Sequence, residues 1–286
     1  MKEIVVLSGK GGTGKTTVLA SFAALAENSV LCDCDVDAPN LHLLLEPVPR
    51  EVHEFHGLEV AHIHSEACNE CGLCVDSCRF DAIRGFQVDP LACEGCGLCA
   101  RICPLEAVSM RDTLAGHWYV SRTRYGPLVH ARLRAAQENS GKLVMAIRKE
   151  ARDLAQEMKA RLILSDGPPG IGCPAISSLS GAQMALIVTE PSLSGMHDLE
   201  RVLGLCRHFS VSPLVCINKC DLSEENSRRI EDHCRDVGVE VAGRIPFDPD
   251  VNSAIVHGKP VVETSNGVAS REITTLWEAI AACPVP

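Results

Sequence analysis

Short apolar runs recur along the 286-residue chain, separated by longer segments of mixed polarity. Runs of about five residues bounded by polar or glycine residues predict buried strands, because they are too short for stable helices. Strands are predicted in this way over residues 4–7, 29–33, 162–165, 185–189 and 214–217. Residues 59–64 alternate instead, which predicts one short strand with a polar face.

Helical segments are predicted between and after these strands. They cover residues 18–26, 142–159 and 269–282. The middle segment keeps four apolar side chains on one helical face: Leu143, Ile147, Leu154 and Met158. Residues 46–57 contain two prolines and a glycine, and they predict a domain boundary.

A glycine-rich loop stands between the first strand and the first helix. Gly9, Gly14, Lys15 and Thr16 fit the phosphate-binding pattern GxxxxGK[ST]. Glycines allow consecutive backbone N–H groups to surround phosphate oxygens, and the helix N-terminus adds a partial positive charge. Lys15 is expected to reach the β- and γ-phosphates, and the Thr16 hydroxyl to ligate Mg²⁺. The nucleotide-binding candidates in the loop are Gly9, Lys10, Gly11, Gly12, Thr13, Gly14, Lys15, Thr16 and Thr17.

Composition narrows the class of protein. The net charge is −10 and no dense Lys/Arg block is present, which disfavours nucleic-acid binding. No apolar run approaches the ~18 residues of a membrane span, and the chain enters its first strand without a signal peptide. A cytoplasmic protein without stable membrane association is therefore expected. The 16 cysteines then indicate metal binding rather than disulfides.

Eight of the cysteines form two runs with ferredoxin spacing. Each run reads C-x₂-C-x₂-C-x₃-C, which is the bacterial two-cluster pattern, and the fourth cysteine of each run ligates the other cluster. The first predicted 4Fe–4S cluster uses Cys68, Cys71, Cys74 and Cys103, and the second uses Cys93, Cys96, Cys99 and Cys78. Zinc is the rival metal, but duplicated runs with this phasing argue against it. Arg79 stands where the first run usually has proline.

The segment that holds these cysteines, residues 57–115, contains no lysine and is rich in acidic residues. An acidic surface would suit a basic redox partner.

Lys10 gives the loop the form GKGGTGKT, which resembles the deviant Walker A loop of the MinD/Mrp/nitrogenase-iron-protein ATPases. The resemblance implies an α/β P-loop NTPase fold, with a mostly parallel sheet and helices on both faces. It also implies an ATP-gated homodimer in which Lys10 reaches the nucleotide of the partner subunit. Residues 1–56 and 116–286 would form this ATPase domain, and residues 57–115 an inserted α+β ferredoxin-like domain.

Three carboxylates follow the second predicted strand. In the MinD-like family, the matching position of Asp35 orients the attacking water, and that of Asp33 supports the Mg²⁺ shell. Asp37 is a third carboxylate in this loop or a plain acidic turn residue. Lys15, Mg²⁺ and the partner's Lys10 would stabilise charge on the γ-phosphoryl group.

The strand at residues 162–165 ends at Asp166, the arrangement of a Walker B aspartate that holds Mg²⁺ through water. Residues 218–221 fit NKxD, which leaves GTP formally possible, although the Lys10 signature favours ATP by resemblance. By the same resemblance Asn218 and Lys219 contact the base, and Pro246 and Asp248 belong to a loop that flanks adenine.

The remaining cysteines include two features of interest. Cys32 and Cys34 alternate along a strand and are expected on opposite faces, as small core residues. Cys173 lies seven residues after Asp166, an offset that matches a cluster-bridging cysteine of the nitrogenase iron protein. It is either a ligand of a bridging cluster or a small residue at a helix start.

Three outputs remain open at this point. The chain is an ATP-gated electron donor to a partner protein, an iron–sulfur cluster carrier or assembly factor of the Mrp type, or a positioning ATPase of the MinD type without a membrane tail. The two ferredoxin-type clusters, each with a full set of cysteine ligands, favour electron transfer. Cys173 favours the cluster-carrier function if it binds a labile cluster.

Overall fold

The computed structural model describes residues 1–134 and 140–283. The described chain divides into two compact units. The first contains Met1–Val52, Trp118–Arg132 and the residues from Ser140 onward, and the second contains His53–His117 and the short segment that begins at Leu133. Among the described residues, no helix is long and apolar enough to cross a membrane.

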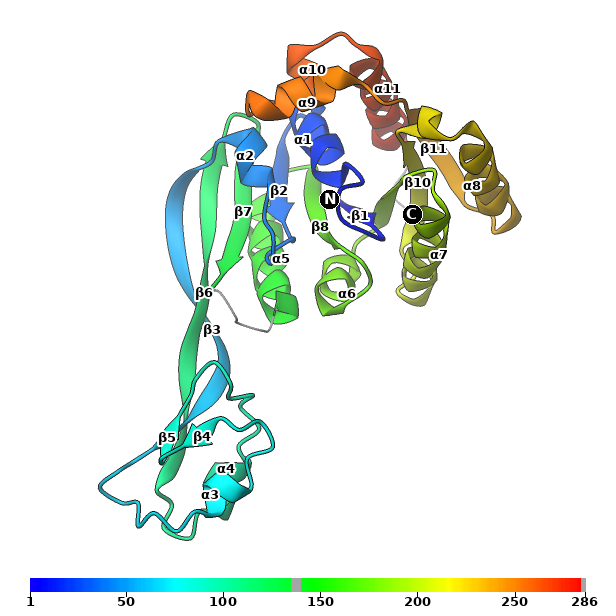
Figure 1. Cartoon of the computed structure of the whole chain (residues 1–286). Helices are drawn as coiled ribbons and strands as arrows, with labels where there is room; N and C mark the ends of the chain where they lie inside the picture. The colour runs from blue at the N-terminus through cyan, green and yellow to red at the C-terminus, as the bar shows by residue number, and fades with distance from the viewer. Residues whose placement is uncertain (135–139, 284–286) are drawn as a thin grey trace. The chain divides into compact units, whose positions relative to one another are not determined.

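A nine-stranded sheet organises the first unit (Figure 1), in the order β11-β10-β9-β1-β8-β2-β7-β6-β3. Neighbouring strands from β11 to β7 pair in parallel. These strands are β1 (Lys2–Ser8), β2 (Ser29–Asp33), β7 (Gly126–Leu133), β8 (Leu162–Pro169), β9 (Met184–Thr189), β10 (Ser212–Asn218) and β11 (Glu240–Ile245). The expected mostly parallel α/β P-loop fold is confirmed.

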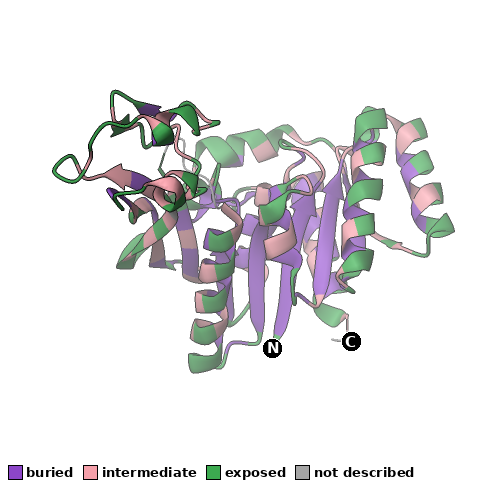
Figure 2. Cartoon of the chain, turned by 90° about the horizontal axis from the view of Figure 1, so that it is seen from below, coloured by how far each residue is buried: buried purple, intermediate pink, exposed green. Residues whose placement is uncertain are grey.

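Helices cover both faces of this sheet (Figure 1), and alternate residues of β1 show why. Ile4 and Val6 enter one apolar core, whereas Val5 and Leu7 enter the other. The first core packs under α1 (Lys15–Leu25), α2 (Leu41–Leu45), α9 (Pro249–Val256), α10 (Val261–Thr264) and α11 (Val268–Ala282). The second packs under α6 (Cys173–Leu179), α7 (Leu193–His208) and α8 (Glu224–Asp236), and α5 (Ser140–Glu157) lies beside α6. The central strands β1, β2, β8 and β9 are almost wholly buried (Figure 2), whereas the edge strand β11 is mostly half-buried.

Two details of the predicted helices and strands are wrong. Helix α5 ends at Glu157, so Met158 lies beyond it and is 48% exposed rather than on the buried face. The short strand expected at residues 59–64 is the end of β3 (Val48–Ile63), a 16-residue strand at the sheet edge. Pro49 lies inside this strand, because an edge strand does not need every backbone N–H for pairing.

The second unit is small and contains short elements. These are α3 (Leu73–Asp76), β4 (Ile83–Arg84), β5 (Gln87–Val88) and α4 (Leu98–Ile102). Strands β4 and β5 form an antiparallel hairpin whose turn residues, Gly85 and Phe86, both have positive φ. Parts of β3 and of β6 (Val108–Thr123) belong to the second unit and the rest to the first. Whether residues 57–115 form a ferredoxin domain stays a prediction.

Candidate functional site

The glycine-rich loop connects β1 to α1 and has the backbone shape that its glycines permit. Gly12 and Gly14 have φ values of 80° and 94°, in the left-handed region that favours glycine. A Cβ on Gly14 would also lie 2.3 Å from Nδ2 of Asn218. Both backbone conformation and space therefore require glycine at position 14.

Lys15 and Thr16, the first residues of α1, contact the acidic side chains that the sequence predicts for this site. Lys15 Nζ lies 3.3 Å from Oδ2 of Asp35, and both side chains are almost fully buried. Burial raises the pKa of Asp35, and the charge of Lys15 opposes the increase. The Thr16 hydroxyl donates a hydrogen bond of 2.6 Å to Oδ2 of Asp166. The structure thus brings together residues that are up to 150 positions apart.

Asp33 and Asp166 are neighbours on the adjacent strands β2 and β8, and both are buried. Oδ2 of Asp33 and Oδ1 of Asp166 have no hydrogen-bond partner within the described structure. Burial is the main reason that the pKa of Asp166 is raised to about 6. Burial and then the charge of Asp166 raise the pKa of Asp33 well above its usual range. Two unpartnered carboxylate oxygens beside a threonine hydroxyl are the kind of donors that Mg²⁺ prefers.

A cavity of about 490 Å³ opens beside the loop. Its polar wall includes Lys15, Thr16, Asp35, Asn218 and Lys219. Its apolar wall comes from α2, β11, α9 and α11: Leu43, Leu44, Ile245, Val251, Ile255 and Ile273. A phosphate-binding loop at one side and apolar side chains at the other suit a nucleotide, with the base against the apolar wall.

Asp248, assigned to an adenine-flanking loop, is not among the residues that line this cavity, and neither is Pro246. Asp248 caps α9 by accepting a hydrogen bond from the backbone N–H of Asp250 at 3.0 Å. Its second oxygen accepts from the N–H of Ala269 at the start of α11. The structure therefore gives Asp248 a local structural role. Ile245 and Val251, from the same segment, line the cavity together with Ile255, and the adenine-flanking role of Pro246 and Asp248 stays a prediction.

Asn218 points its side chain at the glycine-rich loop. Its Nδ2 donates to the carbonyl of Thr13 at 2.7 Å, and its Oδ1 accepts from the N–H of Lys219. Asp221, the aspartate of the NKxD match, accepts from the N–H of Phe247 at 2.7 Å and does not line the cavity. Asp221 thus holds the loop after β11.

Glu190, which follows β9 directly, is a polar residue of this region that the sequence argument missed. One of its carboxylate oxygens lies 3.1 Å from Nζ of Lys10 and the other 2.6 Å from Nζ of Lys219. Burial would raise the pKa of Glu190, but hydrogen bonds from Lys219 and Lys10 outweigh it and lower the pKa. Its position after a central parallel strand was the available signal, because the carboxyl ends of such strands converge on ligand sites.

The expectation that Cys32 and Cys34 point to opposite faces is wrong. Their sulfur atoms lie 3.6 Å apart, and both side chains are fully buried. Residues two positions apart along an extended chain point to the same face, so the alternation rule itself places these two sulfur atoms together and the expectation applied it incorrectly. Cys173 is the first residue of α6 and is exposed.

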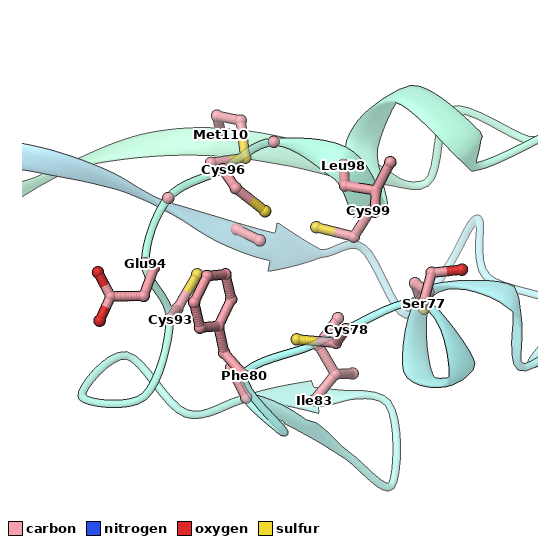
Figure 3. A pocket seen from close by; sticks show the side chains of 15 residues that line it. Ser77, Cys78, Phe80, Ile83, Cys93, Glu94, Cys96, Leu98, Cys99 and Met110 are labelled. Atoms are coloured by element: carbon pink, nitrogen blue, oxygen red, sulfur yellow. The ribbon is translucent and has the colours of Figure 1, made fainter.

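The eight cysteines of the two runs gather around two cavities in the second unit. One cavity is lined by Cys78, Cys93, Cys96 and Cys99, together with Cys74. Figure 3 shows that the sulfur atoms of the first four point toward the same space. The other cavity is lined by Cys68, Cys71, Cys74 and Cys103. These are the two sets that the spacing predicts, although the presence of clusters stays a prediction.

Comparison of the sequence with known protein families identifies the family of this chain. The sequence profile of the CobQ/CobB/MinD/ParA nucleotide binding domain matches residues 4–261. The chain belongs to this family. An uncharacterised protein of Methanocaldococcus jannaschii is 34% identical over 281 residues, which cover 97% of this chain and 96% of that one.

Solved structures of MinD proteins share the fold. The cell division ATPase MinD of Pyrococcus furiosus superimposes with a TM-score of 0.62 at 21% identity, over 98% of both chains. The septum site-determining protein MinD of Pyrococcus horikoshii, complexed with Mg-ADP, gives 0.61 at 18% identity, over 98% of this chain and 96% of that one.

The matched family model describes a nucleotide-binding domain, and the two MinD structures share the fold of this chain.

Proposed function

We propose that this MinD-family ATPase carries two 4Fe–4S clusters in its second unit and uses ATP to gate electron transfer from them to a partner protein. The observation that carries the proposal is the grouping of eight cysteines around two cavities. Each cavity is lined by the four cysteines that crossed ligation requires, and Cys74 lines both.

The surroundings of the cysteines support clusters over single metal ions. Within the described residues, no three His, Cys, Asp or Glu side chains come close enough together to hold one metal ion. Thiolates around a cubane lie further apart than those around zinc, because the cubane occupies the space between them. Backbone N–H groups of Glu70 and Ala107 donate to the sulfurs of Cys68 and Cys103 at 3.4 and 3.3 Å. Such N–H···S bonds stabilise the negative charge of a ligated cluster.

The nucleotide site supports a hydrolytic switch built from this chain's own residues. Lys15 would leave Asp35 for the phosphates, which frees the Asp35 carboxylate to orient a water molecule. Thr16, Asp33 and Asp166 would hold Mg²⁺, which would neutralise charge on the phosphates. By resemblance, two ATP-bound copies form a homodimer in which each Lys10 contacts the other nucleotide.

The test is the reduction potential of both clusters, measured anaerobically on the full chain with and without Mg-ATP. We expect a shift in at least one potential upon ATP addition, and no shift in the Lys15→Ala variant, which keeps all cysteines. Lys149→Ala, which changes an exposed lysine of α5, is the matched control and should behave as wild type. Equal potentials with and without ATP in the wild-type protein would refute gating.

A positioning ATPase of the MinD type is the second candidate, and the names of the relatives favour it. Under this hypothesis the protein should occupy a discrete place in the cell that Lys15→Ala abolishes. Uniform distribution of a fluorescent fusion would argue against it. Transfer of iron to an apo-protein that Cys173→Ser stops would instead support the carrier role.

A further inference from the structure

The strand order places one carboxylate between two lysines at the edge of the nucleotide site. Strands β10, β9 and β1 are consecutive neighbours in the sheet. Lys219 follows β10, Glu190 follows β9, and Lys10 follows β1 by two residues. Parallel strands lie about 4.8 Å apart, so residues just beyond their carboxyl ends are within side-chain reach of one another. The central position of β9 puts Glu190 between the two cations.

Glu190 uses each of its oxygens for a different lysine. Oε2 lies 3.1 Å from Lys10 Nζ and Oε1 lies 2.6 Å from Lys219 Nζ. The Glu190 side chain is 17% exposed, and those of Lys10 and Lys219 are 35% and 32% exposed. Lys219 also approaches the carbonyl of Gly12 at 3.4 Å. The bridge therefore joins the glycine-rich loop to the segment after β9.

The backbone fixes Glu190 in this place. Its carbonyl accepts a hydrogen bond from the N–H of Ser192 at 2.8 Å, and the Ser192 hydroxyl caps α7 by accepting from the N–H of Gly195. Helix α7 also packs tightly against the start of the loop, because a Cβ on Gly9 would lie 2.2 Å from Cβ of Asp198. A carboxylate on such a short capped connection cannot follow Lys10 if Lys10 moves toward a ligand.

Lys10 is thereby kept from the nucleotide cavity. Lys15 and Lys219 line that cavity, whereas Lys10 does not. The phosphate oxygens of a nucleoside triphosphate attract the Lys10 ammonium group more strongly than the Glu190 carboxylate does, because a triphosphate carries several negative charges. We propose that Glu190 is a positioning residue of the ATPase: it holds Lys10 in the nucleotide-free chain and yields it to a phosphate group when a nucleoside triphosphate binds. The proposal depends on neither the clusters nor the identity of the output.

Breaking one partly exposed ion pair costs little, so the expected effect is modest but measurable. Glu190→Gln keeps the size of the side chain and removes its charge. At low salt we expect the variant to bind a fluorescent ATP analogue about threefold to tenfold more tightly than wild type, because Lys10 no longer has to leave a carboxylate. The difference should shrink at high salt, because salt screens partly exposed charges. Glu225→Gln removes an exposed ion pair with Arg229 on α8 and is the matched control.

A double-mutant cycle with Lys10→Met separates the positioning role from a general electrostatic one. If Glu190 acts through Lys10, the gain from Glu190→Gln is clearly smaller in the Lys10→Met background, where only the pair with Lys219 is left to break. The same gain in both backgrounds would overturn the proposal, as would unchanged or weaker binding by Glu190→Gln. Thermal melting of the nucleotide-free variants checks the fold. Should Glu190→Gln fail to fold, Glu190→Asp keeps the charge on a shorter side chain and should give intermediate affinity; wild-type or weaker affinity would contradict the proposal.

Discussion

The first unit buries large apolar side chains on both faces of its sheet, whereas the second buries few side chains larger than alanine. Phe22, Leu19, Leu31 and Leu128 are fully buried in the first unit. The buried apolar side chains described in the second unit are Ala61, Cys74, Ala82, Ile83, Ala107, Val108 and Ala115. A unit of this size with so little apolar burial needs another source of stability. Cluster ligation would supply it, since metal-binding free energy becomes folding free energy.

The largest effect is expected from removing the cluster ligands or the iron of the second unit, which should unfold that unit. If the proposal of two clusters holds, Cys78→Ser or anaerobic iron removal leaves the second unit without its main support. We expect limited proteolysis to cut within residues 57–115 while the first unit stays intact and still binds nucleotide. Cys283→Ser, in a half-buried cysteine outside both runs, is the matched control. Unchanged protease resistance of the iron-free wild-type chain would show that the clusters do not hold this unit together.

The reciprocal change removes core volume from the first unit. Phe22 lies on α1, is fully buried, and has its ring centroid 5.1 Å from that of Trp277 on α11. Phe22→Ala should lower the free energy of unfolding of the first unit by about 3–5 kcal/mol, through lost burial and the cavity left behind. Denaturant unfolding followed by Trp277 fluorescence measures it. The iron–sulfur absorbance of the folded variant should match wild type; a simultaneous loss would mean that the two units depend on one another.

Part of the nucleotide site could be predicted from the sequence, because each residue belongs to a local motif at a strand end. This part comprises the phosphate-binding loop with Lys15 and Thr16, and Asp166. Their convergence follows from the parallel sheet, whose carboxyl ends meet at one edge. The two cysteine sets could be predicted for a similar reason. The spacing alone specifies that the fourth cysteine of each run belongs to the other set.

Features that depend on the order of strands in the sheet, or on where a helix or strand ends, could not be predicted from the sequence. Glu190 meets Lys10 only because β9 lies between β10 and β1, and no local pattern encodes that order. Cys32 and Cys34 lie together as residues two positions apart on an extended chain should, so here the sequence held the answer and the alternation rule was applied incorrectly. The two units divide at Val52 and His53, within the boundary predicted for residues 46–57, but the sequence did not show that one continuous strand, β3, runs across the division. The two backbone N–H groups that the Asp248 carboxylate accepts, from Asp250 and Ala269, depend on where α9 and α11 begin and were not indicated by the sequence.

The smallest expected effect concerns the buried carboxylates of the first unit and acts through pH. The folded pKa of Asp166, about 6, is above the ~3.9 of an unfolded aspartate. Between these values the folded state binds more protons than the unfolded state. The stabilising contribution of protonated Asp166 is therefore complete below pH ~4 and is lost as pH rises through about 6. The loss should amount to about 2–3 kcal/mol without metal, and the raised pKa of Asp33 acts in the same direction.

Asp166→Asn isolates this contribution, because an amide does not titrate. Without Mg²⁺, the melting temperature of wild type should fall relative to that of Asp166→Asn between pH 4.5 and 7. Added Mg²⁺ should restore wild type at pH 7.5, because the cation stabilises the charged carboxylates, and should help Asp166→Asn less. The second unit has no comparable buried carboxylate pair among its described residues, so the pH effect should appear only in the transition of the first. Parallel pH curves for the two proteins would contradict the placement of Asp166 as an unpartnered buried acid.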